Sequence, residues 1–179
     1  MSRNSLSRTL FRSAPVEKVE GRTVFGLAVP YGDVIDVNDF GGYRESFERG
    51  AFAKTIKARG DKVKLFTGHD RQRLPIGRAT ELRESAAGLH AAFEIAATRD
   101  GDDALELVKS GTVDSFSIGF RPIASRSDGD VTVMTEVALM EVSLVGIPAY
   151  EGAAIAGVRS HHQRISTAAA SARLRLLNL

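Results

Sequence analysis

Three side chains of this sequence carry the groups that acyl-transfer chemistry needs, although they stand far apart along the chain. Ser117 lies in TVDSFSIGF, His69 follows a glycine in KLFTGHD, and Glu141 lies in LMEVSLVG. A serine hydroxyl becomes a nucleophile when a histidine takes its proton, and a carboxylate can hold that imidazole in the required tautomer. The residue types therefore predict a nucleophile, a general base and an orienting acid, provided that the fold brings them together.

Each of these side chains also has an ordinary structural explanation, which the sequence leaves open. Serines in strands are commonly solvated or hydrogen-bonded, and Ser115 stands two residues ahead of Ser117 in the same pattern. Glu141 would lie on the exposed face of an edge strand, or it would need a partner if it were covered. His90 alternates with apolar residues in GLHAAFEI, which favours a solvent-facing position. Spacing alone cannot show that the three residues meet.

The sequence does not favour a metal ion or another cofactor. The chain has no cysteine, which excludes thiolate ligands and a cysteine nucleophile. The pairs His69–Asp70 and His161–His162 come without further ligands at a useful spacing. The glycines form no phosphate-binding motif ahead of a helix. We therefore expect no cofactor and no metal.

Alternating patterns predict the strands that would position the candidate residues. Strands are expected over residues 23–29 and 62–67, and two more are joined by a turn near residues 85–88. His69 therefore falls at a strand end. The segment GDVTVMTEVALMEVSLVGIPA predicts one long strand or two, with Glu141 and Ser143 on one face.

The strand that carries the serines alternates most clearly. In SFSIGFRPI, the alternation points one set of side chains to the core and the other set to the opposite face, where a hydroxyl would be accessible. The core set is Phe116, Ile118 and Phe120, and the opposite set is Ser115, Ser117 and Gly119.

Two helices are predicted between the strands. Residues 51–59 and 99–110 have apolar residues at helical spacing, basic residues near the end and a glycine just beyond. Many short strands with two inserted helices indicate a mainly β protein with peripheral helices, of the α+β class. The expected architecture is a mostly antiparallel β-barrel or a curved sheet with the helices outside, because the strand–helix alternation of parallel α/β folds is absent.

Composition and charge indicate one globular domain between two basic ends. The chain has 179 residues, 43% hydrophobic and 26% charged. Residues 1–15 contain three arginines and residues 159–179 contain four, with no acid in either end, so residues 16–158 are net negative. We expect an N-terminal tail over 1–15, a domain over 16–158 and a tail over 159–179. No apolar run of about 18 residues and no secretory signal are present, which predicts a cytoplasmic protein without a membrane partner.

Several blocks in succession resemble one family. FTGHD, LPIGRATELRESAAGL, VDSFSIGF and EVALMEVSLVGIPAYEGAAI are similar, in this order, to blocks of the prohead proteases of tailed bacteriophages, which are also carried by phage-derived gene transfer elements. VFGLAVPYGDV and ESFERGAF fit the N-terminal part of that family, so the resemblance covers about residues 15–158. It implies a serine endopeptidase of capsid maturation, with a barrel fold similar to herpesvirus assemblins.

The resemblance also implies a role for each candidate residue. His69 matches the general base, Ser117 rather than Ser115 matches the nucleophile, and Glu141 matches the third member. Assemblins have a second histidine in that third place, so the glutamate follows the phage pattern. Gly119 would leave room for a substrate backbone beside the nucleophile. Backbone amides or an arginine such as Arg121 would stabilise the oxyanion.

The resemblance finally implies partners and a place of action. The substrates would be the scaffold segment of the major capsid protein and the enzyme itself, inside the assembling procapsid in the bacterial cytoplasm. By analogy with assemblins, self-association as a dimer is a further expectation. The C-terminal tail would dock to the scaffold, be trimmed by self-cleavage, or have no function.

Two alternatives remain at this point. The chain could be a catalytically inactive capsid-assembly or scaffolding protein of the same fold, although the three residues stand in their proper blocks. It could instead be a nucleic-acid-binding β-barrel that uses its basic ends. The net-negative body and the lack of aromatic clusters beside Arg or Lys argue against nucleic acid as a partner.

Overall fold

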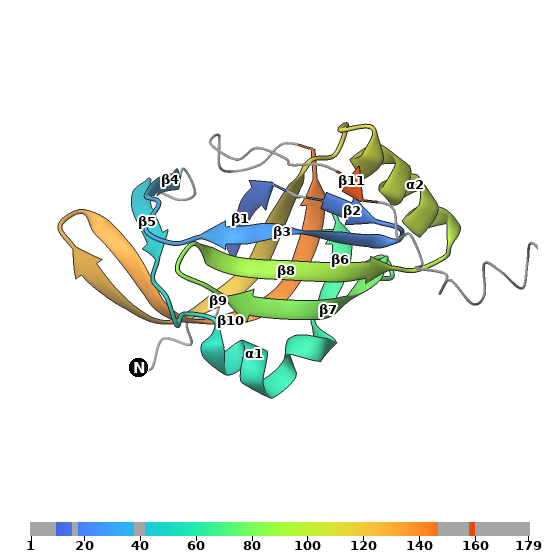
Figure 1. Cartoon of the computed structure of the whole chain (residues 1–179). Coiled ribbons are helices and arrows are strands. Elements are labelled where there is room, and N and C mark those ends of the chain that lie inside the picture. Colours follow the sequence, from blue (N-terminus) through green and yellow to red (C-terminus); the bar gives the residue numbers. More distant parts are fainter. Residues whose placement is uncertain (1–9, 16–17, 38–41, 147–157, 160–179) are drawn as a thin grey trace, which may run out of the picture.

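The computed structural model describes residues 10–15, 18–37, 42–146 and 158–159 (Figure 1). Eleven strands are β1 Leu10–Pro15, β2 Lys18–Glu20, β3 Thr23–Pro30, β4 Ile35–Val37, β5 Tyr43–Phe47, β6 Lys64–Thr67, β7 Gly77–Glu84, β8 Gly88–Ile95, β9 Ser115–Asp128, β10 Val131–Val145 and β11 Val158–Arg159. The two α-helices are α1 Ala53–Arg59 and α2 Arg99–Lys109, and a 3-10 turn spans Gly60–Lys62. No helix in these ranges is both long and apolar enough to cross a membrane.

All eleven strands belong to one strongly curved, mixed sheet (Figure 1). The hydrogen-bonded order is β1-β9-β10-β6-β7-β8-β3-β2-β11, and β5 adds to β10 and in turn pairs β4. Strand β10 runs parallel to both β6 and β5, and β11 runs parallel to β2, whereas the other ladders are antiparallel. Helix α1 lies along one side of the sheet, and α2 lies near one end (Figure 1).

The mainly β class with peripheral helices is confirmed, but the expected mostly antiparallel, closed barrel is not. Among the described strands, β1 and β3 approach each other without forming a ladder, so the sheet remains open. The parallel pairing of β5, β6 and β10 has a topological cause. Helix α1 links β5 to β6, and such a crossover allows both strands to run in the same direction beside β10.

Most of the predicted elements are present with small shifts of their ends. The strand predicted over 62–67 starts at Lys64, because the preceding residues form the 3-10 turn. The segment predicted as one strand or two is the single strand β10. Strand β1 lies within the predicted N-terminal tail and pairs with β9, which carries Ser117. The domain boundaries remain a prediction.

Aromatic side chains form the centre of the core. Phe47 stacks on Phe52, with ring centroids 5.6 Å apart, and meets Phe120 edge-on at 5.2 Å. In the neighbouring part of the core, Phe93 packs against Phe116, with ring centroids 5.9 Å apart. These residues are all fully buried. Aromatic rings from several strands therefore pack against the apolar face of β9 and hold it in place.

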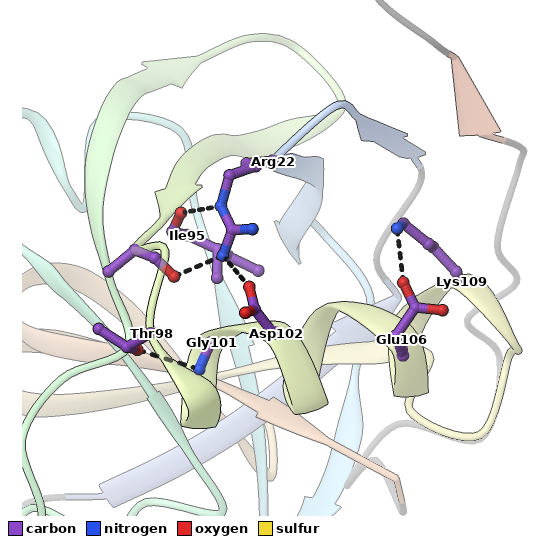
Figure 2. Close-up of polar contacts among 8 residues, drawn as sticks. Arg22, Ile95, Thr98, Gly101, Asp102, Glu106 and Lys109 are labelled. Carbon is purple, nitrogen blue, oxygen red and sulfur yellow. Dashed lines mark hydrogen bonds and ion pairs between the residues drawn. The ribbon is translucent and has the colours of Figure 1, made fainter.

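Helix α2 is fastened to the sheet by polar contacts at its first turn (Figure 2). The guanidinium of Arg22 donates to the carbonyl oxygens of Ile95, at 3.0 Å, and Ala96, at 2.5 Å, and pairs with Asp102 at 2.7 Å. The Thr98 hydroxyl caps the helix by accepting from the backbone of Gly101. Close packing requires the glycine, since a Cβ at position 101 would lie 2.2 Å from a backbone oxygen.

The start of helix α1 is stabilised by a carboxylate from β7. The Glu84 Oε1 atom accepts hydrogen bonds from the Tyr31 hydroxyl and from the backbone of Gly50, at 3.0 Å, and Phe52, at 3.2 Å. Phe52 is the N-cap residue and has no capping side chain of its own. Burial and the hydrogen bond to Glu84 raise the pKa of Tyr31, so the phenol stays protonated and continues to donate.

We expect Glu84→Ala to lower the free energy of unfolding by about 2 kcal/mol, because three donors would lose their acceptor. Urea denaturation followed by circular dichroism measures this loss. The control is Glu81→Ala on the same strand, where, among the described residues, an exposed carboxylate accepts from exposed Arg83. That change should stay within about 0.5 kcal/mol. Equal effects of the two substitutions would contradict the capping role.

Candidate active site

Strand β10 lies between the two segments that carry the candidate serine and histidine. On one side it pairs antiparallel with β9, so that Ser143 stands opposite Ser117 and Glu141 opposite Gly119. On its other side it pairs in parallel with β6, with Leu144 opposite the last β6 residue. His69 follows β6 by two residues. The register of β10 therefore brings the segments around residues 69, 117 and 141 to one place in the sheet.

A tight turn after β6 directs the His69 ring back across β10. The backbone N–H of Gly68 donates to the Leu144 carbonyl at 3.0 Å, and that of Asp70 donates to Thr67 at 3.1 Å. Both central residues have positive φ, 57° for Gly68 and 61° for His69. His69 is the one non-glycine residue with positive φ in the described part of the chain. A side chain in this region is uncommon, so surrounding contacts must hold it.

The structure places the three predicted side chains in direct contact. The His69 Nδ1 atom lies 2.8 Å from Glu141 Oε1, and its Nε2 atom lies 2.6 Å from Ser117 Oγ. A carboxylate only accepts hydrogen bonds, so we assign the ring hydrogen to Nδ1. Nε2 then presents a lone pair to the Ser117 hydroxyl. This is the geometry in which an imidazole can remove the hydroxyl proton.

The burial of these residues corrects one expectation, for Ser117, and decides between two alternatives for Glu141. Ser117 was expected on an accessible face, but it is 1% exposed, because side chains cover both faces of this half of β9. Glu141 is also 1% exposed, and it lies on an internal strand rather than at the solvent face of an edge strand. The His69 side chain is 18% exposed. The imidazole is therefore the most accessible member of the three.

Sequence reasoning gave no role to Ser143, which joins the same network. Its hydroxyl lies 2.7 Å from Glu141 Oε2 and 3.1 Å from the backbone nitrogen of His69. Ser143 is fully buried. The available signal was its position two residues after Glu141, since alternate residues of a strand share one face. The pattern E-x-S could have suggested a hydroxyl beside the carboxylate.

The other candidates lie outside this network. Ser115 is buried, and its hydroxyl donates to the Asp114 carboxylate at 2.8 Å. Gly119 lies on the same face of β9 as Ser117, and Arg121 is exposed two residues farther along. His90 is half-buried rather than solvent-facing, and it is hydrogen-bonded to Ser85 at 2.9 Å. His161 and His162 lie outside the described residues.

A cavity of about 470 Å³ adjoins the His69 turn. The β6–β10 side of the cavity includes Gly68 and Leu144, and the α2 side includes Ala104 and Leu107. The carboxylate of Asp103 also lines it. Within the described ranges, no group of three or more His, Asp and Glu side chains is arranged to hold a metal ion. The contacts of His69 therefore lie beside a partly apolar cavity.

Comparison with protein families assigns the chain. A profile described as caudovirus prohead serine protease matches residues 13–168. The chain belongs to this family. The match includes β9, β10 and the His69 turn, so all the residues of the network fall within the prohead protease region.

Curated relatives agree with the family assignment. The prohead protease of Escherichia phage T5 is 36% identical over 87 residues, which are 47% of this chain and 40% of that protein. The prohead protease of Enterobacteria phage HK97 is 30% identical over 119 residues, which are 62% of this chain and 51% of that protein. The chain spans about half the length of the curated relatives it matches.

A solved structure supports the fold independently. The bacteriophage T4 capsid assembly protease superposes with a TM-score of 0.51 at 10% identity, over 79% of this chain and 98% of that chain. At this identity the likeness concerns the fold alone. The mixed, mainly β sheet of this prohead protease family member therefore matches the fold of a phage capsid protease.

We expect Glu141→Gln to lower the free energy of unfolding by about 1–3 kcal/mol, because an amide N–H₂ cannot accept the Ser143 hydrogen. Thermal and urea denaturation measure the effect. Glu136→Gln is the matched control on β10, where the carboxylate pairs with the exposed Lys54 at 2.6 Å. The control should cost less than about 1 kcal/mol. A Glu141→Gln protein as stable as the wild type would contradict the hydrogen-bonded arrangement.

Proposed function

We propose that the chain is a serine endopeptidase that cleaves the scaffold segment of a major capsid protein during procapsid maturation. The observation that carries the proposal is the continuous contact from Ser117 through His69 to Glu141, with separations of 2.6 Å and 2.8 Å. Membership of the prohead serine protease family supports the reaction class. The Ser-His-Glu assignment rests on the contacts themselves.

The contacts suggest a two-step reaction. Ser117 Oγ attacks a peptide carbonyl while its proton passes to Nε2 of His69, and the Glu141 carboxylate stabilises the imidazolium that forms. The tetrahedral intermediate collapses as the C–N bond breaks and the leaving amine takes the proton from Nε2. A water molecule then gives a proton to Nε2 and hydrolyses the acyl-enzyme, which restores the Ser117 hydroxyl.

Substrate must reach a nucleophile that is covered in this state. Ser117 is 1% exposed, so a bound peptide has to displace what covers it. In this proposal Gly119 gives the substrate backbone room beside the nucleophile. Backbone amides or the exposed Arg121 would stabilise the oxyanion. The cavity beside the His69 turn would receive a substrate side chain.

The substrate and the place of action follow from the relatives by analogy. The curated relatives are prohead proteases, and the solved neighbour is a capsid assembly protease. Inside a procapsid in the bacterial cytoplasm, protease and scaffold would be held at high local concentration, so modest affinity for the cleavage site would suffice. Self-cleavage and dimer formation belong to the same proposal.

The alternative of an inactive assembly protein of the same fold is less well supported. A structural protein would have no need to hold a histidine at φ 61° with both ring nitrogens engaged. Such strained positions persist where the surroundings over-determine them, and they cluster at functional sites. The intact contacts therefore favour the enzyme.

Replacing the nucleophile tests the proposed function. We expect Ser117→Ala to lower the rate of capsid protein cleavage by about 10⁴-fold or more, since no hydroxyl remains for acyl transfer. The chain is co-expressed with the major capsid protein of the same phage or transfer element, and gel electrophoresis follows the shortening of the capsid protein.

The control variant removes the neighbouring serine. Ser115→Ala deletes an equally buried hydroxyl of β9 that bonds to Asp114 instead of His69. It should leave cleavage close to the wild-type rate. Unchanged processing by Ser117→Ala, or loss of processing only in Ser115→Ala, would refute the assignment of the nucleophile.

A further inference from the structure

The Ser143 hydroxyl connects two parts of the same histidine. It accepts from the backbone N–H of His69 at 3.1 Å and reaches Glu141 Oε2 at 2.7 Å, while Glu141 Oε1 holds the His69 ring at 2.8 Å. The contacts form a closed hydrogen-bond network that includes both the backbone and the imidazole of His69. Ser143 and Glu141 are almost completely buried, so water cannot readily substitute for these partners.

The direction of every hydrogen bond in this closed network follows from two groups of fixed character, a backbone N–H that only donates and a carboxylate that only accepts. A backbone N–H can only donate, so Ser143 Oγ is the acceptor for His69. The hydroxyl has a single hydrogen, and it points to Oε2, which only accepts. Each Glu141 oxygen then has one donor, Ser143 at Oε2 and the ring at Oε1.

The directions of these hydrogen bonds determine which nitrogen of the His69 imidazole carries the hydrogen. Because Oε1 receives its hydrogen from Nδ1, Nε2 of His69 is left without one and faces Ser117 at 2.6 Å. The opposite tautomer would place a lone pair of Nδ1 against a carboxylate lone pair, which is repulsive. If the Ser143 hydroxyl were removed, Oε2 would lack its donor and the carboxylate would turn away from its present position.

We propose that Ser143 is a positioning residue for the peptidase reaction, acting through Glu141 and the His69 backbone to hold the imidazole in the tautomer that accepts the Ser117 proton. The role rests on the proposed function. The two hydrogen bonds of the Ser143 hydroxyl go to the His69 backbone and to Glu141. The contact with the His69 backbone stabilises the left-handed conformation of the turn at φ 61°. Both the position of the imidazole and the location of its hydrogen therefore depend on the Ser143 hydroxyl.

The test compares Ser143→Ala with Ser143→Thr, which keeps a hydroxyl, and with Ser115→Ala, which removes a buried hydroxyl outside the hydrogen-bond network. The ¹⁵N chemical shifts of the His69 ring, assigned by their loss in His69→Gln, report its tautomer. The rate of covalent modification by a fluorophosphonate reports nucleophile activation: the Ser117 Oγ–P bond forms, fluoride leaves and the proton passes to Nε2. Thermal unfolding identifies variants that are merely unstable.

We expect a wild-type ring with hydrogen on Nδ1, and a mixture of tautomers in Ser143→Ala. The modification rate of Ser143→Ala should fall about 10- to 100-fold, the effect of losing a hydrogen bond to a charged group. Ser143→Thr should restore the tautomer and most of the rate, and Ser115→Ala should match the wild type. Should the alanine variant fail to fold, Ser143→Cys, whose thiol is a weaker donor, should show an intermediate rate.

The outcomes separate this inference from the proposed function. A folded Ser143→Ala or Ser143→Cys protein with the wild-type tautomer and the wild-type rate would overturn the role of Ser143 while leaving the peptidase intact. A wild-type protein that does not react at all would instead count against the nucleophile. In that case an unchanged tautomer in Ser143→Ala would also reject the effect of Ser143 on the imidazole, and a mixed tautomer would support that effect without the peptidase reaction.

Discussion

A buried carboxylate in the middle of the sheet is the constraint on which the site depends. Glu141 is 1% exposed on β10, and a charge in that position is tolerated only if its oxygens are hydrogen-bonded. Its two donors are the His69 ring and the Ser143 hydroxyl. The need to satisfy this carboxylate therefore selects the conformation of the histidine turn, and the histidine in turn faces the Ser117 hydroxyl.

The mixed sheet is what makes such an arrangement geometrically available. An antiparallel neighbour, β9, supplies Ser117 from one side of β10, and a parallel neighbour, β6, ends level with Leu144 on the other side. Because β6 ends there, the chain can turn back over β10 and carry His69 to the carboxylate. The cost is the backbone strain of a histidine at φ 61°. Several hydrogen bonds in the turn and in the site offset this strain.

The local elements were predictable from the sequence because they follow from short-range patterns. The core set Phe116, Ile118 and Phe120 is fully buried as the alternation indicates, and both helices lie where their periodicity places them. The burial of Ser117 was not predictable, since it depends on what packs over the second face of β9. The parallel pairing of β6 with β10 is a long-range choice with no signature in either strand. The contact of Ser143 with the His69 backbone follows from that pairing and was missed for the same reason, although the strand period indicated its place beside Glu141.

The proposed mechanism requires that one serine be activated by the contacts around His69. Its most direct test is to locate the adduct formed by diisopropyl fluorophosphate, by mass spectrometry of the intact chain and of its peptides. A single adduct is expected on Ser117 in the wild-type protein, and none when His69 is replaced by alanine. An adduct on Ser115, or labelling of Ser117 at an undiminished rate without the imidazole, would contradict it.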